Sequence, residues 1–344
     1  MQTTQLPKNA TISNKKNTMK AIHTLKYGGP EVFKLVEINK PQPKENEVLI
    51  KIYAASVTAA DTFMRKGDPL YGRLFLGLTK PKSPIPSTGF SGVIETIGGK
   101  VNKFKVGDKV FGESIFADGT SAEYVCVSED GIIIKKPENI THPEACNICD
   151  GAVTSLNFLE AIGKIKSGQK LLINGASGSL GTAAIQIAKY FGAEVTAVCS
   201  ERNIEFVKSL GADHTINYTQ QDFTKTNQKF DVVYDSIGAS TYKKCKKVLS
   251  KNGLYLSPVL SGTLLFQVLY TSIFSKQKAK FAATGLKPIS EIKLLLEAVV
   301  SLIENDKLKV SIDRTYQLNQ ISEAHRFVDT GRKRGNIALV IHQD

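Results

Sequence analysis

The sequence predicts an α/β protein in which a doubly wound parallel sheet is joined to a second, mostly antiparallel β domain. Roughly the first 140 residues contain strand-like segments separated by Gly-Asp and Asp-Gly turns, with few helical periods between them. Strands and helices alternate after Lys170, and parallel strands need such crossover helices. A glycine-rich turn links the first of these strands to its helix.

Composition limits the possible classes of protein. The chain has 344 residues, of which 42% are hydrophobic and 22% charged, so we expect two globular domains rather than a disordered chain, a coiled coil or a collagen-like repeat. No apolar run reaches the roughly 18 residues that span a bilayer, and we expect no membrane partner. The polar N-terminus lacks a secretory apolar core, and five cysteines fit a reduced compartment. We therefore expect a cytoplasmic protein.

The formal net charge of +13 raises the question of nucleic-acid binding. Small basic clusters occur at Lys15–Lys16, Lys243–Lys247 and Arg332–Arg334, but they form no stripe interleaved with aromatic residues. We expect solvated helix faces and a phosphate-bearing small molecule to account for the charge. The sequence predicts no nucleic-acid partner, and nucleic-acid binding remains an alternative.

Strand signals define the first domain. Residues 1–18 predict a disordered tail, and residues 19–143 predict the β domain. The expected strands are Met19–Leu25, Phe33–Ile38, Glu47–Ala54, Gly92–Ile97, Lys109–Gly112 and Ala122–Val127.

Residues 144–288 predict the parallel-sheet domain, which begins with a helix over Glu144–Leu159. Residues 289–344 add the amphipathic helix Ile289–Asn305 and two alternating strands, Thr315–Leu318 and Ile337–His342, which we expect to return to the first domain. The other expected strands are Lys170–Asn174, Glu194–Val198, His214–Asn217, Asp231–Asp235 and Gly253–Pro258, and the helices between them are Ser179–Phe191, Asn203–Leu210 and Thr241–Leu249.

The glycine-rich turn is the strongest functional signal. An apolar strand runs into the turn, a helix follows at once, and a second strand comes about twenty residues later. Glycines let the backbone approach a pyrophosphate, which the free N–H groups of the helix start then bind. This arrangement predicts a Rossmann dinucleotide site, whose residues are Gly175, Ser177, Gly178, Ser179, Leu180 and Gly181.

The end of the second strand indicates which dinucleotide binds. An acidic residue there would accept from the ribose 2′-OH, whereas Ser200 and Arg202 can bind a 2′-phosphate. The neighbouring Glu201 argues the other way unless it is a solvated carboxylate at the helix start. Tyr218, after the third strand, either reaches the same phosphate or simply packs. These residues favour NADPH over NADH.

The ordered series of motifs resembles the medium-chain dehydrogenase/reductase superfamily, in its zinc-free quinone oxidoreductase (zeta-crystallin-like) branch. This resemblance implies a GroES-like β domain beside the Rossmann domain, with the active site between them. It places Ile237 and Gly238 at the nicotinamide ribose and Asn336 near the cofactor. It also implies a homodimer paired through the last Rossmann strand, at Lys280–Thr284. The motifs are Tyr27–Val32, Ala54–Asp61, Phe104–Gly112, Ala122–Val125, Asn174–Gly181, Ser209–Asp213, Phe230–Asp235 and Glu323–Arg326.

Many members of this superfamily use catalytic zinc, which needs three side-chain ligands. The resemblance places the ligand positions at Thr58, Thr88 and Asp150, and threonine hydroxyls bind zinc poorly. Cys146 and Cys149 form a CxxC pair that no second pair completes, so we expect packed free thiols. The sequence predicts no metal. The five histidines are scattered, and we expect them to be structural or solvated.

Without zinc, hydrogen-bond donors must stabilise the negative charge that develops on a substrate oxygen. The resemblance places Thr58 and Asp61 beside the nicotinamide and Phe63 against the cofactor. We expect Thr58 to donate to the substrate oxygen. Asp61 orients the loop or Arg65, or is a cap carboxylate. The predicted function is NADPH-dependent reduction of a quinone or an α,β-unsaturated carbonyl.

Several alternatives remain open at this point. An NADP-dependent alcohol or aldehyde dehydrogenase shares the fold, and a non-catalytic NADPH sensor would share the cofactor site. The apolar segment Leu260–Ser275 is either a lid or lipophilic wall of the substrate site, or a buried helix or dimer contact. One segment departs from the family pattern. Relatives carry an acidic residue shortly before Ser91-Gly92, whereas this chain has Ser87-Thr-Gly89 there and therefore lacks that carboxylate.

Overall fold

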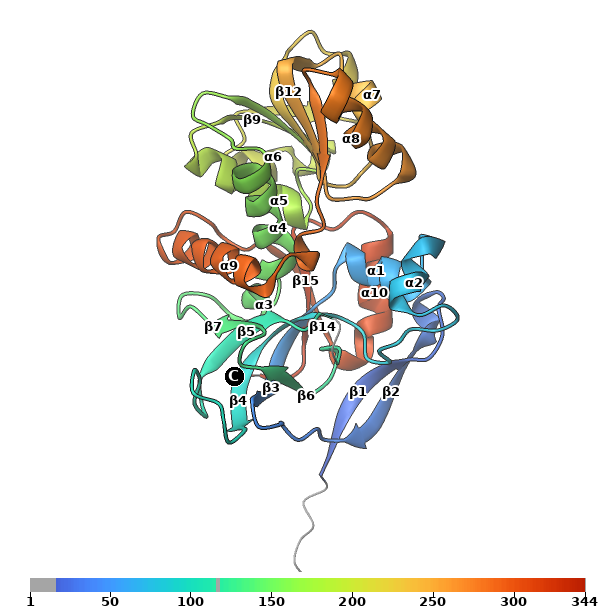
Figure 1. The fold of residues 1–344 in the computed structure, drawn as a ribbon, viewed down its shortest axis with the longest axis vertical. Coiled ribbons are helices and arrows are strands. Elements are labelled where there is room, and N and C mark those ends of the chain that lie inside the picture. The colour runs from blue at the N-terminus through green and yellow to red at the C-terminus, as the bar shows by residue number, and fades with distance from the viewer. Residues whose placement is uncertain (1–16, 116–117, 344) are drawn as a thin grey trace, which may run out of the picture.

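The computed structural model describes residues 17–115 and 118–343 (Figure 1). Residues 1–16 of the expected tail lie outside the described residues, and Thr18 is already the first residue of β1. The chain forms a parallel sheet at one end and an antiparallel sheet at the other.

The parallel sheet has the strand order β10-β9-β8-β11-β12-β13. Every neighbouring pair runs parallel. Numbered from β8, this order is 3-2-1-4-5-6, the order of a dinucleotide-binding sheet. The strands are β8 (Lys170–Asn174), β9 (Glu194–Cys199), β10 (His214–Asn217), β11 (Phe230–Asp235), β12 (Leu249–Ser257) and β13 (Lys278–Phe281).

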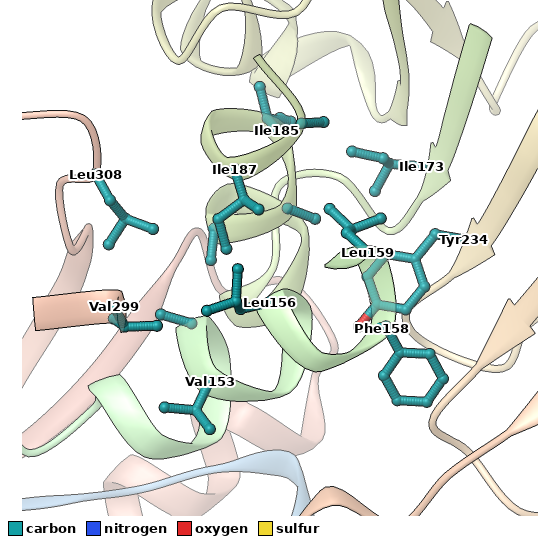
Figure 2. Close-up of a cluster of buried hydrophobic side chains, with 14 of the residues drawn as sticks. Val153, Leu156, Phe158, Leu159, Ile173, Ile185, Ile187, Tyr234, Val299 and Leu308 are labelled. Atoms are coloured by element: carbon teal, nitrogen blue, oxygen red, sulfur yellow. The ribbon is translucent and has the colours of Figure 1, made fainter. Parts of the chain in front are cut away.

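Apolar side chains cover both faces of this sheet, because successive residues of a strand point to opposite sides. Leu171 and Ile173 belong to the core under α5 and α9, whereas Leu172 between them belongs to the core under α7 and α8. Figure 2 shows the first of these cores, where Tyr234 lies near Phe158 and Ile173. The doubly wound sheet predicted from the sequence is confirmed.

The mostly antiparallel sheet follows the path β14-β15-β3-β4-β5-β7, with β6 paired to β3, and its β14–β15 pair is parallel. The C-terminal β15 pairs with β3, so the end of the chain returns to the first domain, as expected. β1 and β2 form a separate antiparallel pair. The bounds are β1 (Thr18–Thr24), β2 (Phe33–Asn39), β3 (Glu47–Ser56), β4 (Gly89–Ile97), β5 (Lys109–Glu113), β6 (Tyr124–Ser128), β7 (Ile132–Lys135), β14 (Ile312–Gln317) and β15 (Asn336–Val340).

The helices differ from the sequence prediction at one important place. The single helix expected over Glu144–Leu159 is interrupted by the π-helical turns η3 (Cys149–Val153) and η4 (Asn157–Ile162). Gly151 in η3 packs so closely on α5 that a Cβ would lie 2.7 Å from Ser179 Oγ. The helices are α1 (Ala59–Lys66), α2 (Arg73–Leu76), α3 (His142–Ala145), α4 (Thr154–Leu156), α5 (Ser179–Tyr190), α6 (Ile204–Ser209), α7 (Tyr242–Cys245), α8 (Gly262–Phe274), α9 (Ile289–Glu304) and α10 (Ile321–Asp329).

Helix α9 connects the two parts of the fold. Its buried side chains Ile292, Leu296 and Val299 join the core that also contains α5 and Phe111 of β5. α9 therefore packs on the Rossmann side as well as on the β domain to which the sequence analysis assigned it. None of the helices in the described part of the chain has the length and apolarity needed to cross a bilayer.

Candidate active site

The glycine-rich loop lies at the carboxyl end of β8, where doubly wound sheets bind their ligands. Gly175 has φ of 80°, a left-handed conformation that glycine adopts without strain. Gly181 lies so close to the loop that a Cβ would be 2.3 Å from Gly175 O. These two glycines hold the loop against the first turn of α5.

Helix α5 starts without a side-chain cap: the N-cap residue is Gly178, which has no side chain to accept a hydrogen bond from the first N–H groups of the helix. The first N–H groups of a helix have no partner within it and carry partial positive charge. A Cβ built on Gly178 would meet only Gly175 O, at 3.4 Å, so the space over the loop is open. The uncapped helix start and the open space fit a dinucleotide pyrophosphate.

Basic side chains gather at the end of β9, beside the glycine-rich loop. Arg202 Nη2 donates to Arg332 O at 2.6 Å, which brings the Arg332–Arg334 cluster beside the end of β9. Tyr218 N–H donates to Cys199 O at 3.1 Å, so exposed Tyr218 lies next to Ser200. The structure brings Ser200, Arg202 and Tyr218 together, and it adds the basic cluster to them.

The other expected cofactor residues also gather around the loop. Ile237 packs against Gly175, since a Cβ there would lie 2.6 Å from Ile237 Cγ2, and Gly238 follows with φ of 66°. Ser177 Oγ accepts from Asn203 Nδ2 at 2.9 Å. Asn336 Oδ1 accepts from Ser179 Oγ at the start of α5.

Thr58 and Asp61 form a capping box at the start of α1. The Thr58 N–H and hydroxyl both donate to Asp61 Oδ2, at 2.7 and 2.8 Å, and Asp61 N–H donates back to Thr58 Oγ1 at 3.1 Å. Phe63 lies on the same helix, 46% exposed. The alternative in which Asp61 orients Arg65 is wrong, because Arg65 pairs with Asp329 of α10 at 2.6 Å. Asp61 acts as a capping carboxylate at the start of α1, which was the other predicted alternative.

Burial changes the proton affinity of Asp61. It raises the pKa of the carboxyl to about 7, and the nearby Asp150 adds to the rise against the Thr58 hydrogen bonds. The second carboxyl oxygen of Asp61, Oδ1, is buried without a hydrogen-bond partner. A proton on Oδ1 would neutralise the carboxylate, so no unpaired negative charge would be buried there. Asp150 accepts from Ser179 Oγ at 3.3 Å. Asp150 therefore contacts the start of α5 and is close enough to Asp61 to raise the pKa of that carboxyl.

Two charged residues of this region were missed by the sequence analysis. The first is Glu113 of β5, which lies opposite Gly89 of β4. Its carboxylate accepts a hydrogen bond from Thr88 Oγ1 at 2.9 Å, and burial raises its pKa to about 7. Burial lowers the pKa of Lys333, against the opposing attraction of Asp150. Glu113 supplies a carboxylate beside the segment where relatives carry their own. Strand register brings it there, and no local motif signals it.

Metal-ligating side chains do not gather at this site. In residues 17–115 and 118–343 no three His, Cys, Asp or Glu side chains are grouped so that they could hold a metal ion. Cys146 and Cys149 are free, buried thiols, and burial raises the pKa of both.

The raised pKa of Asp61 predicts a pH dependence of stability. The folded chain binds this proton more tightly than the unfolded chain, so this contribution is complete below about pH 4 and is lost as the pH rises through about 7. Asp61→Asn should reduce the loss of unfolding free energy between pH 5 and pH 8 by about 1–3 kcal/mol. Urea unfolding at both pH values measures this difference.

Glu205→Gln, at a side chain 87% exposed, is the matched control and should keep the wild-type slope. If Asp61→Asn shows that slope too, the carboxyl is ionised at neutral pH and the inferred protonation is wrong.

Family models match both parts of the chain. Residues 44–138 match the alcohol dehydrogenase GroES-like domain, and residues 210–339 match a model described as a zinc-binding dehydrogenase. The second match contains none of the positions Thr58, Thr88 and Asp150.

Relatives match nearly the whole chain. The 2-methylene-furan-3-one reductase of Solanum lycopersicum is 32% identical, over 93% of this chain and 79% of its own length. The mitochondrial NAD(P)H oxidoreductase RTN4IP1 of Mus musculus is 30% identical, over 96% and 91%. The structure of the Coxiella burnetii quinone oxidoreductase superimposes with a TM-score of 0.83 at 32% identity, covering 94% of this chain and 100% of that one. The chain therefore belongs to the medium-chain dehydrogenase/reductase superfamily, as an NAD(P)H-dependent oxidoreductase of its quinone oxidoreductase branch.

Proposed function

We propose that the chain uses NADPH to reduce a quinone or an α,β-unsaturated carbonyl, without zinc. One observation carries the proposal: Asp150 bonds to Ser179 at the uncapped start of α5 and acts electrostatically on the buried Asp61, which pairs with Thr58. These contacts support a pyrophosphate site close to polar groups that would face a reacting oxygen. The similar furanone reductase and quinone oxidoreductase act on acceptors of the two proposed types.

The cofactor would be held mainly by backbone groups. The first-turn N–H groups of α5 would bind the pyrophosphate, and NADPH would supply the hydride. Ile237 and Gly238 would border the nicotinamide ribose, and Asn336 would approach through its contact with Ser179. The full set also contains Phe63, Gly175, Ser177, Gly178, Ser179, Leu180 and Gly181.

The preference for NADPH over NADH would come from the basic groups beside the end of β9. A guanidinium binds a phosphate through two parallel hydrogen bonds, and Arg202 lies against the Arg332 backbone at that place. Ser200 and Tyr218 offer hydroxyl groups beside it. The exposed carboxylate of Glu201 would repel the 2′-phosphate, but the net charge beside the end of β9 would stay positive. Three arginines contribute to it: Arg202, Arg332 and Arg334.

The substrate oxygen would accept a hydrogen bond from the Thr58 hydroxyl. That hydroxyl bonds to Asp61 Oδ2 in the structure, so Asp61 positions it and Thr58 must rotate to meet a substrate. The protons that burial retains on Asp61 and Glu113 reduce the negative charge facing an oxygen that becomes negative during reduction. Water can supply the final proton.

Zinc would find poor ligands at the three positions that the family uses. Thr58 and Thr88 offer hydroxyl groups already bonded to Asp61 and Glu113, and structural and catalytic zinc ions prefer thiolate, imidazole and carboxylate ligands. Only Asp150 offers such a ligand. We therefore propose that hydrogen bonding replaces the Lewis acid in this chain.

We propose that the two domains have different roles. Residues 144–288 would hold the cofactor, and residues 19–143 and 289–344 would supply the substrate side.

The proposal also covers the oligomeric state and the cellular compartment of the protein. Two copies would pair through β13, the last strand of the sheet path in the described residues, which spans Lys278–Phe281 and not the expected Lys280–Thr284, because Thr284 begins a 3-10 turn. Its Lys278 and Lys280 bond to carbonyls of their own chain and leave that edge open. The five free thiols support a reducing compartment such as the cytoplasm.

Arg202→Ala tests the cofactor preference. Loss of a charged hydrogen bond to the 2′-phosphate should weaken NADPH binding by about 1–3 kcal/mol, roughly 5- to 150-fold, and leave NADH binding nearly unchanged. Fluorescence titration of both cofactors measures this. Lys208→Ala, on exposed α6, is the control. An equal loss for NADPH and NADH would refute the assigned role.

A screen of electron acceptors tests the reaction. With NADPH, quinones and enones should be reduced at rates that a chelator does not change, while simple aldehydes and alcohols should react at least tenfold more slowly. Chelator-sensitive alcohol oxidation would instead identify an alcohol dehydrogenase. Binding of NADPH without reduction of any acceptor would identify a cofactor sensor.

A further inference from the structure

Helix α8 presents large apolar side chains to solvent and packs on the protein through Leu264 and two polar residues, Gln267 and Thr271. The buried positions include Gln267 and Thr271, which accept from Tyr242 N–H at 3.1 Å and from Ala279 N–H at 2.9 Å. The outward face is a stripe of large apolar side chains with exposed fractions between 44% and 70%. Its members are Leu265, Phe266, Leu269, Tyr270, Ile273 and Phe274.

The rings of this outward face are ordered along the helix. Phe266 and Tyr270 stack with centroids 6.4 Å apart, and Tyr270 and Phe274 lie 5.6 Å apart. Leaving such a surface in water is unfavourable, by roughly 25 cal/mol per Å² of apolar area. A face of this kind marks an interaction site. The buried-helix alternative is wrong, because these side chains are exposed, whereas the lid, substrate-wall and dimer-contact alternatives stay predictions.

The chain around α8 is strongly basic. Residues 236–290 contain nine lysines and no Asp or Glu. α7 packs on α8 and exposes Lys243 and Lys244, while Lys276 follows α8 directly and Lys278 Nζ donates to Thr271 O at 2.7 Å near its C-terminus. The apolar face is therefore flanked by cationic groups without compensating carboxylates in its own segment.

A second apolar surface adjoins the first. Tyr71 Oη donates to Leu260 O at 3.2 Å, which joins the α2 region to the segment that leads into α8. Leu70, Leu74 and Phe75 of that region are each at least 67% exposed. Figure 1 shows α2 and α8 on the same side of the molecule.

We propose that the outward face of α8, with its lysine flanks, docks on an anionic lipid surface. Aromatic and aliphatic side chains would enter the headgroup boundary, while the lysines would attract acidic headgroups. A second copy is a poorer occupant of the α8 face, because a two-fold contact there brings Lys243, Lys244 and Lys276 of both copies together. At the proposed β13 pairing, by contrast, Lys278 and Lys280 bond to carbonyls of their own chain. The sequence analysis expected no membrane partner. Under this proposal that expectation would be right for membrane-spanning segments and wrong for binding to a membrane surface. This inference does not depend on the proposed function.

Vesicle flotation tests the proposal with the full chain. Wild type should float with vesicles of phosphatidylcholine containing 30% phosphatidylserine (roughly the surface charge of an anionic leaflet) and not with pure phosphatidylcholine. Raising the salt concentration should weaken binding. The variant Phe266→Ser/Tyr270→Ser/Phe274→Ser and the variant Lys243→Gln/Lys244→Gln/Lys246→Gln/Lys247→Gln should each bind at least tenfold more weakly.

Tyr190→Ser, at a side chain 54% exposed on α5, is the matched control and should float like wild type. Circular dichroism and light scattering after gel filtration should show every variant folded and with the wild-type mass. Absence of wild-type binding to the acidic vesicles overturns the proposal. So does an apolar-face variant that changes the oligomeric state and keeps its vesicle binding, because a second copy then covers α8.

Discussion

The free N–H groups at the start of α5 are the constraint on which the rest of the site depends. They lack a side-chain partner because Gly178 gives the helix no side-chain cap, and Gly175 and Gly181 bring the loop close to them. A helix start without partners for its N–H groups is unfavourable, and we propose that an anionic ligand supplies them here. The parallel sheet fixes its place at the carboxyl end of β8.

The carboxyl groups nearby follow from the same arrangement. Asp150 bonds to Ser179 at the start of α5, and its charge contributes to the raised pKa of Asp61 and of Glu113. Protons on these two groups remove charge that would repel an oxygen becoming negative. We propose that the region binds an anionic cofactor on one side and accepts developing charge on the other.

Periodicity and local motifs predicted most of the fold and the glycine-rich loop, because these depend on neighbouring residues. The sequence could not show that β4 and β5 bring Glu113 to Thr88, or that Arg65 pairs with Asp329 across the fold. It also missed the interruption of the helix after α3 by π-helical turns. The sequence marked Leu260–Ser275 as apolar but left open whether it covers the substrate site, is buried or pairs with another copy, and only the contacts of α8 show which side faces the protein.

The most direct test of the pyrophosphate site is the affinity of Gly178→Val for NADPH. Gly178 has φ of −82°, which valine adopts, and its added side chain would fill the open space over the loop. Titration should show at least a hundredfold weaker binding, with a melting temperature close to that of wild type and of the control Gly99→Ala, whose Cβ meets nothing within 4 Å. Wild-type affinity in folded Gly178→Val would show that the cofactor does not bind over this loop.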